Sequence, residues 1–189
     1  MVPPTALNGA ETVSIPTAEP EAKPQSKAKA RGAIGSALAL PALLVVAWGF
    51  ALGGSSAPGA VAHESGAMSD LRWILYFTGF VFGFSSIMHS VFRKSTAAST
   101  GWQTNGFELE IAAVSLGLGA GCFYAIYHGI TAMTTISFPI VSFLLLAGVN
   151  HLFEIVKKEN YAPNNTLILI WDFGVPASIV GLLISIGHF

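Results

Sequence analysis

The sequence predicts an all-α fold, a polytopic transmembrane helix bundle of five helices in which a four-helix core follows an N-terminal helix. Composition gives the first reason: apolar residues make up 52% of the 189 residues and the mean hydropathy is +0.62. Charged residues make up only 10%, against about 25% in a typical soluble domain. The apolar residues also fall into five runs of about 20 residues, the length that spans a bilayer.

The first 32 residues differ from the rest of the chain. They hold seven of the nineteen Asp, Glu, Lys and Arg residues and five of the ten prolines. A segment with so few large apolar residues cannot bury enough surface to offset the entropy lost on ordering. We therefore expect residues 1–32 to form a disordered cytoplasmic tail.

The first apolar run, 33–53, has two interpretations. It is an N-terminal transmembrane helix that acts as a signal anchor, or it is a signal peptide cleaved after "APGAVA", a small-x-small pattern that ends before His63. An apolar stretch of about 20 residues exceeds the 7–15 residues usual in signal peptides. We favour the uncleaved helix.

The remaining runs predict helices at 71–92, 107–129, 136–156 and 166–188, which together form a four-helix bundle over residues 71–189. Lys and Arg residues lie before the first run, after the second and after the fourth. If the N-terminus is cytoplasmic, every Lys and Arg except Arg72 lies on the cytoplasmic side. The positive-inside rule then predicts a cytoplasmic N-terminus and an external C-terminus.

Some functions are not supported by any sequence feature. A net charge of −1 without a basic patch argues against a nucleic-acid partner. Cys122 is the single cysteine, so one chain cannot form a disulfide. There is no phosphate-binding glycine loop, nucleophile elbow or Cys-x-x-Cys, so no catalytic motif is recognisable and an enzyme is not favoured.

Glycines at small-xxx-small spacing occur in three of the predicted helices. Such spacing lets helix backbones approach closely in lipid. The glycines are Gly49 and Gly53, Gly79 and Gly83, and Gly117, Gly119 and Gly121. We expect them to pack helices within the bundle, with a homo-oligomer or other membrane-protein subunits as the alternative partners.

Ionisable residues interrupt the apolar runs, as in "GVNHLFEI" (148–155). A charged group at the bilayer centre costs roughly 3 to more than 10 kcal/mol, so such residues are usually satisfied or functional. Four helices each place one such residue roughly 6–10 Å from the cytoplasmic boundary, at 1.5 Å per residue. We predict a shared polar cluster in the cytoplasmic leaflet, with the candidates His89, Glu110, His151, Glu154 and Asp172.

The helix at 107–129 predicts how the cluster is arranged. Steps of three and four residues from Glu110 reach three small residues, then Tyr124 and His128, on one face. We interpret this stripe as the interior face, and Glu108 as a solvated terminal acid. Glu110 is then expected opposite His151, across a tight hairpin.

The loop at 157–165 is expected to cover the cluster. Asn160 and Asn165 favour turns, and Asn165 is placed to cap the N-terminus of the last helix. Within that helix, Pro176 cannot donate a hydrogen bond to the carbonyl of Asp172.

Two stretches carry a family resemblance. "HSVFRKSTAASTGWQTNGFELE" (89–110) holds His-x-x-Phe, Gly-Trp and Phe-x-x-Glu, and "NHLFEIVKKENYAPNNTLILIWDFGVP" (150–176) holds a helix-ending His, an Asn-x-Ala-Pro-x-Asn loop and an Asp. The chain resembles a bacterial family of small integral membrane proteins known as domain of unknown function 6790, over residues 71–188. The matching positions are His89, Gly101, Trp102, Phe107, Glu110, His151, Asn160, Pro163, Asn165 and Asp172. The resemblance implies a bacterial plasma (inner) membrane and no particular activity.

Three classes of function remain open. The favoured class is a binding or accessory subunit whose polar cluster holds a lipid or quinone-like ligand. The second is a proton-coupled transporter of a small solute, because intramembrane acids and histidines act as proton relays. The third is an intramembrane metal or redox enzyme, in which two histidines and two carboxylates bind the metal. Its candidate ligands are His89, Glu110, His151 and Glu154.

Overall fold

A computed structural model describes residues 37–188, so the expected disordered tail lies outside the described residues. All regular structure in this range is helical. The helices, in chain order, are α2 (Ala39–Leu52), α3 (Gly66–Ser90), α4 (Arg93–Thr100), α5 (Phe107–Ala125), α6 (Gly129–Lys158), α7 (Pro163–Thr166) and α8 (Ile168–Ile186). The predicted all-α fold class is confirmed.

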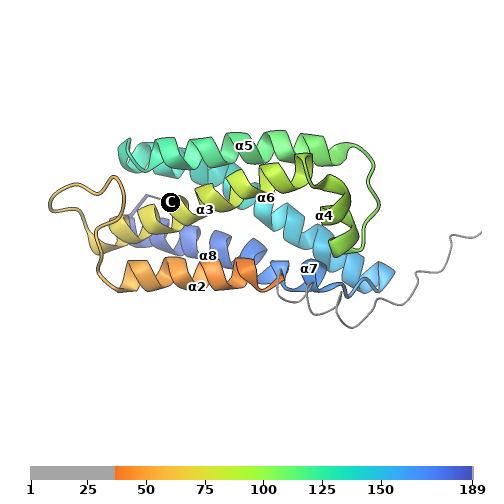
Figure 1. The fold of residues 1–189 in the computed structure, drawn as a ribbon. Helices are drawn as coiled ribbons and strands as arrows, with labels where there is room; N and C mark the ends of the chain where they lie inside the picture. The colour runs from red at the N-terminus through yellow and green to blue at the C-terminus, as the bar shows by residue number, and fades with distance from the viewer. Residues whose placement is uncertain (1–36, 189) are drawn as a thin grey trace, which may run out of the picture.

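Four of these helical segments are long and apolar enough to cross a membrane: α3, α5, α6, and α7 together with α8. The described part of the first expected span is the shorter apolar helix α2. The short helices α4 and α7 were not expected. They occupy the two connections that follow α3 and α6, at one end of the bundle (Figure 1).

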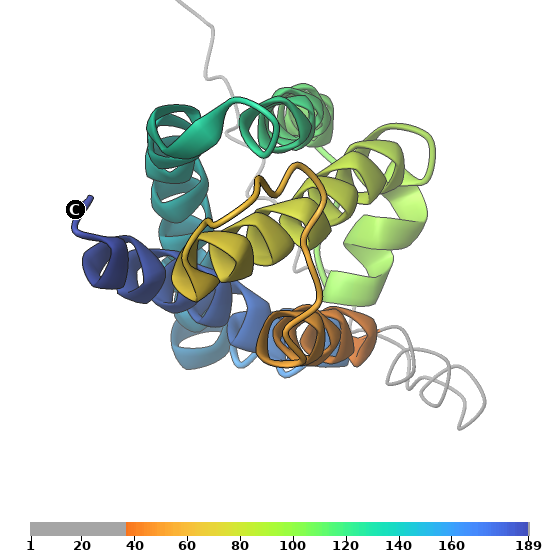
Figure 2. The ribbon, with the colours of Figure 1, turned by 90° about the vertical axis from the view of Figure 1, so that its left-hand side faces the viewer.

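Helix α3 is the centre of the bundle and contacts α2, α4, α5, α6 and α8. Seen along the bundle, the other long helices surround it (Figure 2). The core is built from aliphatic side chains that are almost fully buried, among them Leu75 on α3, Ile140 on α6 and Ile179 on α8. This packing fixes the ends of four helices relative to one another.

Glycines allow α3 and α5 to pack closely, as the spacing predicted. A Cβ atom on Gly119 would lie 3.0 Å from the carbonyl oxygen of Gly79 and 3.1 Å from the backbone nitrogen of Gly83. Backbone atoms cannot move aside as a flexible side chain can, so glycine is favoured at position 119. By contrast, a Cβ on Gly117 would meet no atom within 4 Å. The homo-oligomer interface stays a prediction.

The end of the bundle that carries Arg72 is fixed by a buried ion pair. Arg72 is 2% exposed, its Nε lies 3.0 Å from a carboxylate oxygen of Glu64, and its guanidinium also donates to the carbonyl of Ile126 in the α5–α6 turn. Through Arg72, the segment before α3, which carries Glu64, is connected to the α5–α6 turn, which carries Ile126. Arg72, the basic residue at the end of the bundle away from Arg93, Lys94, Lys157 and Lys158, is therefore a buried, paired residue.

Helix α2 packs into the bundle. The indole of Trp48 donates a 2.9 Å hydrogen bond to Ser178 on α8. After α2, Ala57 is buried, and its backbone nitrogen donates to Ser69 on α3 at 3.4 Å. Ala57 belongs to the stretch that resembles a signal-peptidase site. Retention of the 33–53 helix stays a prediction.

Candidate functional site

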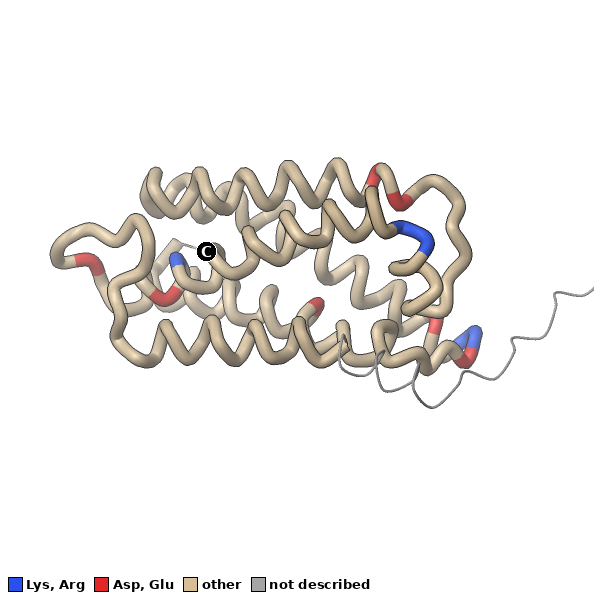
Figure 3. The backbone as a smooth tube through the Cα atoms, viewed as in Figure 1, with Lys and Arg blue, Asp and Glu red and all other residues tan. Residues whose placement is uncertain are grey.

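A pocket of about 660 Å³ lies at the end of the bundle opposite Arg72. We call this end the basic end, because it carries Arg93, Lys94, Lys157 and Lys158 (Figure 3). The pocket is lined by residues of α3, α4, α5, α6 and the 101–106 loop: His89, Thr96, Ala97, Thr100, Gly101, Trp102, Gln103, Asn105, Phe107, Glu108, Ile111, Asn150, Glu154 and Lys158.

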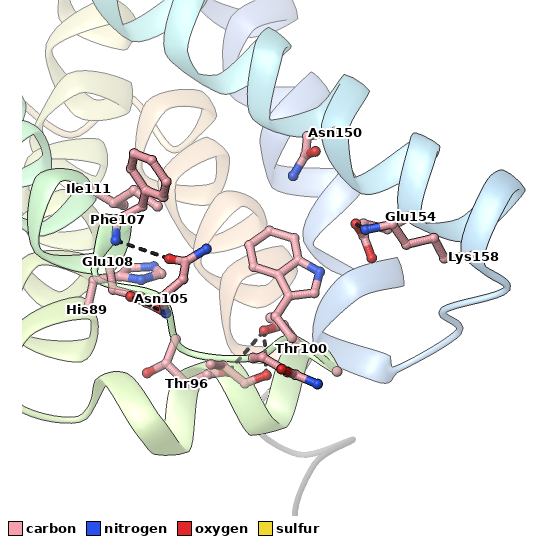
Figure 4. A pocket seen from close by; sticks show the side chains of 14 residues that line it. His89, Thr96, Thr100, Asn105, Phe107, Glu108, Ile111, Asn150, Glu154 and Lys158 are labelled. Atoms are coloured by element: carbon pink, nitrogen blue, oxygen red, sulfur yellow. Dashed lines mark hydrogen bonds and ion pairs between the residues drawn. The ribbon is translucent and has the colours of Figure 1, made fainter. Parts of the chain in front are cut away.

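The pocket forms where two helices separate. Helices α5 and α6 are joined by a short turn near Ile126 and diverge toward the basic end (Figure 1). The gap at that end is partly filled by α4 and the 101–106 loop. His89, Glu108 and Ile111 lie on one side of the pocket, and Asn150 and Glu154 lie on the other (Figure 4).

Glu108 faces the bundle and organises the start of α5. Its carboxylate accepts hydrogen bonds from the backbone nitrogens of Asn105, at 3.2 Å, and Gly106, at 2.8 Å. The Asn105 side chain in turn accepts from the backbone nitrogen of Phe107 at 3.1 Å. These bonds satisfy backbone donors at a helix N-terminus, where a negative charge is also stabilised by the helix dipole.

The predicted interior face of this helix is therefore wrong. Glu108 is buried, whereas Glu110 is exposed and does not line the pocket. Tyr124 and His128, at the other end of the predicted stripe, are exposed too. The residues that face the interior are instead those on the same helix face as Glu108, such as Ser115 and Cys122.

The α6 side of the pocket is polar, although it belongs to a membrane-spanning helix. Glu154 is buried, and its carboxylate pairs with the Lys158 ammonium group at 2.6 Å. Asn150 lies one turn earlier and is exposed within the pocket. An amide exposed to hydrocarbon would lack hydrogen-bond partners. The pocket supplies a polar environment for it.

Behind the pocket, His151 is held by a hydrogen-bond network. Its Nδ1 lies 2.7 Å from Oδ1 of Asn165, and the Asn165 amide nitrogen donates to the carbonyl of Asn160 at 2.8 Å. The Asn160 amide donates to the carbonyl of Thr100 at 2.8 Å. The network therefore connects α6 and α7 to the end of α4.

Gly101 allows this connection. Its φ is +77°, in the left-handed region that glycine adopts most readily, and it caps the C-terminus of α4. A Cβ there would lie 2.6 Å from the side-chain oxygen of Asn160. Both the backbone conformation and the close contact therefore favour glycine.

Trp102 separates His151 from the pocket. The two rings are stacked, with centroids 5.1 Å apart and an interplanar angle of 11°. The indole nitrogen of Trp102 and Nδ1 of His89 are buried and have no hydrogen-bond partner among the described residues. Other atoms of both residues line the pocket.

On the α8 side, His151 faces Asp172. The distance from Nε2 of His151 to Oδ2 of Asp172 is 3.9 Å, and the two residues are 5% and 2% exposed. This carboxylate oxygen has no hydrogen-bond partner among the described residues. Pro176 lies within α8, which continues through it.

The structure thus brings together some of the predicted site residues. His151, Asp172, Asn160 and Asn165 form one group, and His89 and Glu154 line the adjacent pocket. Glu110 belongs to neither, so the predicted Glu110–His151 pair is wrong. The physical reason is that α5 and α6 diverge and do not form a tight hairpin at this end.

The metal hypothesis receives no structural support. Within residues 37–188, no three His, Cys, Asp or Glu side chains form a group that could hold a metal ion. The proposed ligands His89, Glu110, His151 and Glu154 are not assembled at one point.

The role expected for Asn165 is also corrected. Asn165 does not cap the last helix: it lies inside α7, whose N-cap is Ala162, and α8 follows Leu167. Its side chain is fully buried and bonds to His151 and Asn160 instead. The 157–165 loop therefore contributes to the site through a buried amide.

Sequence reasoning did not assign a site role to Trp102, Glu108 or Asn150. Trp102 was visible as a residue of the Gly-Trp motif, and Asn150 as a polar residue in an apolar run. Glu108 differs from Glu110 only in helical phase, for which the sequence offered no reliable signal. Apart from Glu110, the positions on which the family resemblance rests lie in or beside the pocket and its network.

Comparison with known proteins gives one match. The profile of a protein family described as a family of unknown function (DUF6790) matches residues 36–188. This range begins before α2, so it includes the N-terminal apolar helix as well as the four-helix unit, residues 71–188, that carries the sequence resemblance. No curated protein and no solved structure matches the chain.

Proposed function

We propose that this chain, which belongs to the family of unknown function DUF6790, is a membrane-embedded binding protein whose pocket takes the uncharged polar head of a small amphipathic molecule. The observation that carries this proposal is the position of the pocket. It combines polar side chains with Phe107 and Ile111 at one end of an apolar helix bundle.

The size and depth of the pocket fit such a ligand. Small-molecule pockets measure roughly 300–1,000 Å³, and this one measures about 660 Å³. Along α6 the lining extends from Lys158 at the helix end to Asn150, eight residues earlier. At 1.5 Å per residue this is about 12 Å. The pocket therefore extends from the membrane surface into the hydrocarbon region, where an amphipathic molecule resides.

The charges of the lining favour an uncharged head over a phosphate. Lys158 is already paired with Glu154, and the second carboxylate, that of Glu108, faces the same pocket. An anionic head would meet these two carboxylates without a free cation among the lining residues. The indole N–H of Trp102 is buried and unpartnered, and it can only donate; we propose that a bound head reaches it with a carbonyl or hydroxyl oxygen when the ring shifts. A quinone-like head has this chemistry.

The orientation of the protein is part of the proposal. The basic end carries four of the five Lys and Arg residues of the described range, and Arg72 lies at the opposite end (Figure 3). By the positive-inside rule the pocket then faces the cytoplasm in a bacterial inner membrane, with the C-terminus outside. A reporter active only in the cytoplasm, fused after Phe189, should be silent; strong activity would reverse this orientation.

Equilibrium binding to the full-length protein in nanodiscs tests the ligand class. A short-chain benzoquinone should bind, and a short-chain phosphatidic acid should bind much more weakly. Trp102→Phe keeps an aromatic ring but removes the N–H donor. A net hydrogen bond of about 0.5–1.5 kcal/mol corresponds to a loss of about two- to tenfold in affinity.

Glu110→Gln is the matched control, because Glu110 lies on α5 near the pocket but outside its lining. It should bind the quinone as the unmodified protein does. Absence of quinone binding, preferential binding of phosphatidic acid, or equal affinity in Trp102→Phe would each contradict the proposal. Mass spectrometry of molecules that copurify with the protein would identify the natural ligand.

A further inference from the structure

We propose that His151 and Asp172 form a proton-binding site, in which the two buried side chains together retain one exchangeable proton. We call them the proton pair. They come from α6 and α8, and 3.9 Å separates Nε2 of His151 from Oδ2 of Asp172. The site is distinct from the pocket lining and does not depend on what the pocket binds.

The first step is the protonation of the other ring nitrogen. The amide of Asn165 can be oriented because its nitrogen donates to the carbonyl of Asn160 at 2.8 Å and lies 3.5 Å from the carbonyl of His151. Its oxygen therefore faces Nδ1 of His151, 2.7 Å away. An amide oxygen only accepts, so Nδ1 carries a hydrogen. In the neutral ring Nε2 then has a lone pair, and this lone pair faces Asp172.

The second step is to count the protons that the pair can hold. If neither Nε2 nor the carboxyl group carried a proton, a buried carboxylate would face a lone pair and no donor. If both carried one, a buried imidazolium would face a neutral acid. Burial disfavours an uncompensated charge strongly. With one proton the pair is either neutral or an internal ion pair, and the two atoms attract each other in both forms.

The surroundings do not neutralise either side chain separately. The described part of α2 contains no ionisable residue, and His151 also contacts the neutral amide of Asn165 and the ring of Trp102. Among residues 37–188, the remaining ionisable groups at this end are Glu154, Lys157, Lys158 and Glu159 on or just after α6, Tyr161 before α7, His89 on α3, Arg93 and Lys94 on α4, and Glu108 and Glu110 on α5. Glu154 is itself paired with Lys158. The proton therefore belongs to the pair as a unit.

The sequence makes this proposal directly measurable, because Asp70 and Asp172 are the only aspartates in the chain. Aspartate labelled with ¹³C at the side-chain carboxyl can be followed by infrared spectroscopy, and ¹⁵N-labelled histidine by NMR, in the full-length protein in nanodiscs. The measurements are made from mildly acidic to mildly alkaline pH. We expect either a protonated Asp172 carboxyl band or an N–H signal at both ring nitrogens of His151. Because the pair holds one proton, the protonated fractions of the Asp172 carboxyl and of His151 Nε2 should add up to about one.

Two variants assign the signals. Asp172→Asn, which is uncharged and similar in shape, should remove the protonated carboxyl band or return His151 to a single N–H at Nδ1. Asp70→Asn is the matched control and should leave both signals unchanged. If Asp172→Asn does not fold, the Asp70→Asn protein still gives the answer, because Asp172 is then its only aspartate. An ionised Asp172 beside a histidine protonated only at Nδ1, or full protonation of both groups at neutral pH, would overturn the proposal.

Discussion

Replacing Asn165 by leucine should destabilise the protein more than any change of similar size on the same short helix. Asn165 is fully buried and its side chain serves two other groups: it accepts from Nδ1 of His151 and donates to the carbonyl of Asn160. Leucine has a similar volume but no polar atom. The substitution therefore leaves one donor and one acceptor without partners in or near the protein interior.

The magnitude follows from these two groups. A buried polar group that loses its partner costs about 1–3 kcal/mol. The His151 nitrogen is buried and should incur the full cost, whereas the Asn160 carbonyl belongs to a half-buried residue and can regain some hydration. We expect Asn165→Leu to lower the free energy of unfolding by about 2–4 kcal/mol, measured by denaturant titration in detergent micelles.

Thr166→Val is the control. The Thr166 hydroxyl donates only to carbonyls of its own helical segment, those of Ala162 and Pro163, both at 3.3 Å. Its removal should cost less than about 1 kcal/mol. Equal stabilities for Asn165→Leu and Thr166→Val would show that the buried amide does not hold the site together, and the network reasoning would be refuted.

Three further predictions use the same measurement. Gly119→Ala should lower the free energy of unfolding by about 2 kcal/mol or more, in the range of overpacked cores, because its Cβ would clash with the α3 backbone. Gly117→Ala should be neutral, and equal effects of the two substitutions would contradict the close packing of α3 and α5. Gly101→Ala should cost at least about 1 kcal/mol, because alanine is strained at a φ of +77°, and a neutral result would exclude that strain. Glu108→Gln should cost about 1 kcal/mol by weakening charge-assisted hydrogen bonds, while Glu110→Gln should change stability by less than about 0.5 kcal/mol; the reverse order would restore the interior face first predicted.

The sequence was sufficient to predict that the helices exist but not which way they face. In a soluble bundle the polar face of each helix marks the outside. In a membrane bundle lipid is as apolar as the interior, so α5 is apolar on all sides apart from its first turn. Glu108 and Glu110 both lie in that turn but point to different sides of the helix. Which of them is buried depends on which side of α5 faces the bundle.

The site was predicted in its components better than in its arrangement. His151 and Asp172 were recognisable because ionisable residues are rare in apolar helices. Their membership of one cluster was predicted, but His151 was paired with Glu110 instead of Asp172, since the observed pairing depends on α6 packing against α8. Trp102 belongs to a loop whose position is set by Asn160, a residue far along the chain.

The sequence by itself determined the fold class, the four long apolar segments of the bundle and the segregation of basic residues, because these depend on composition and on run length. The tertiary structure alone decided that α5 and α6 diverge, that a pocket lies between them, and that Asn165 binds His151. Those features depend on how closely two backbones approach, as at Gly119, and on where a buried hydrogen bond finds its partner. Neither quantity is a property of a local stretch of sequence, because both arise only when distant segments pack together.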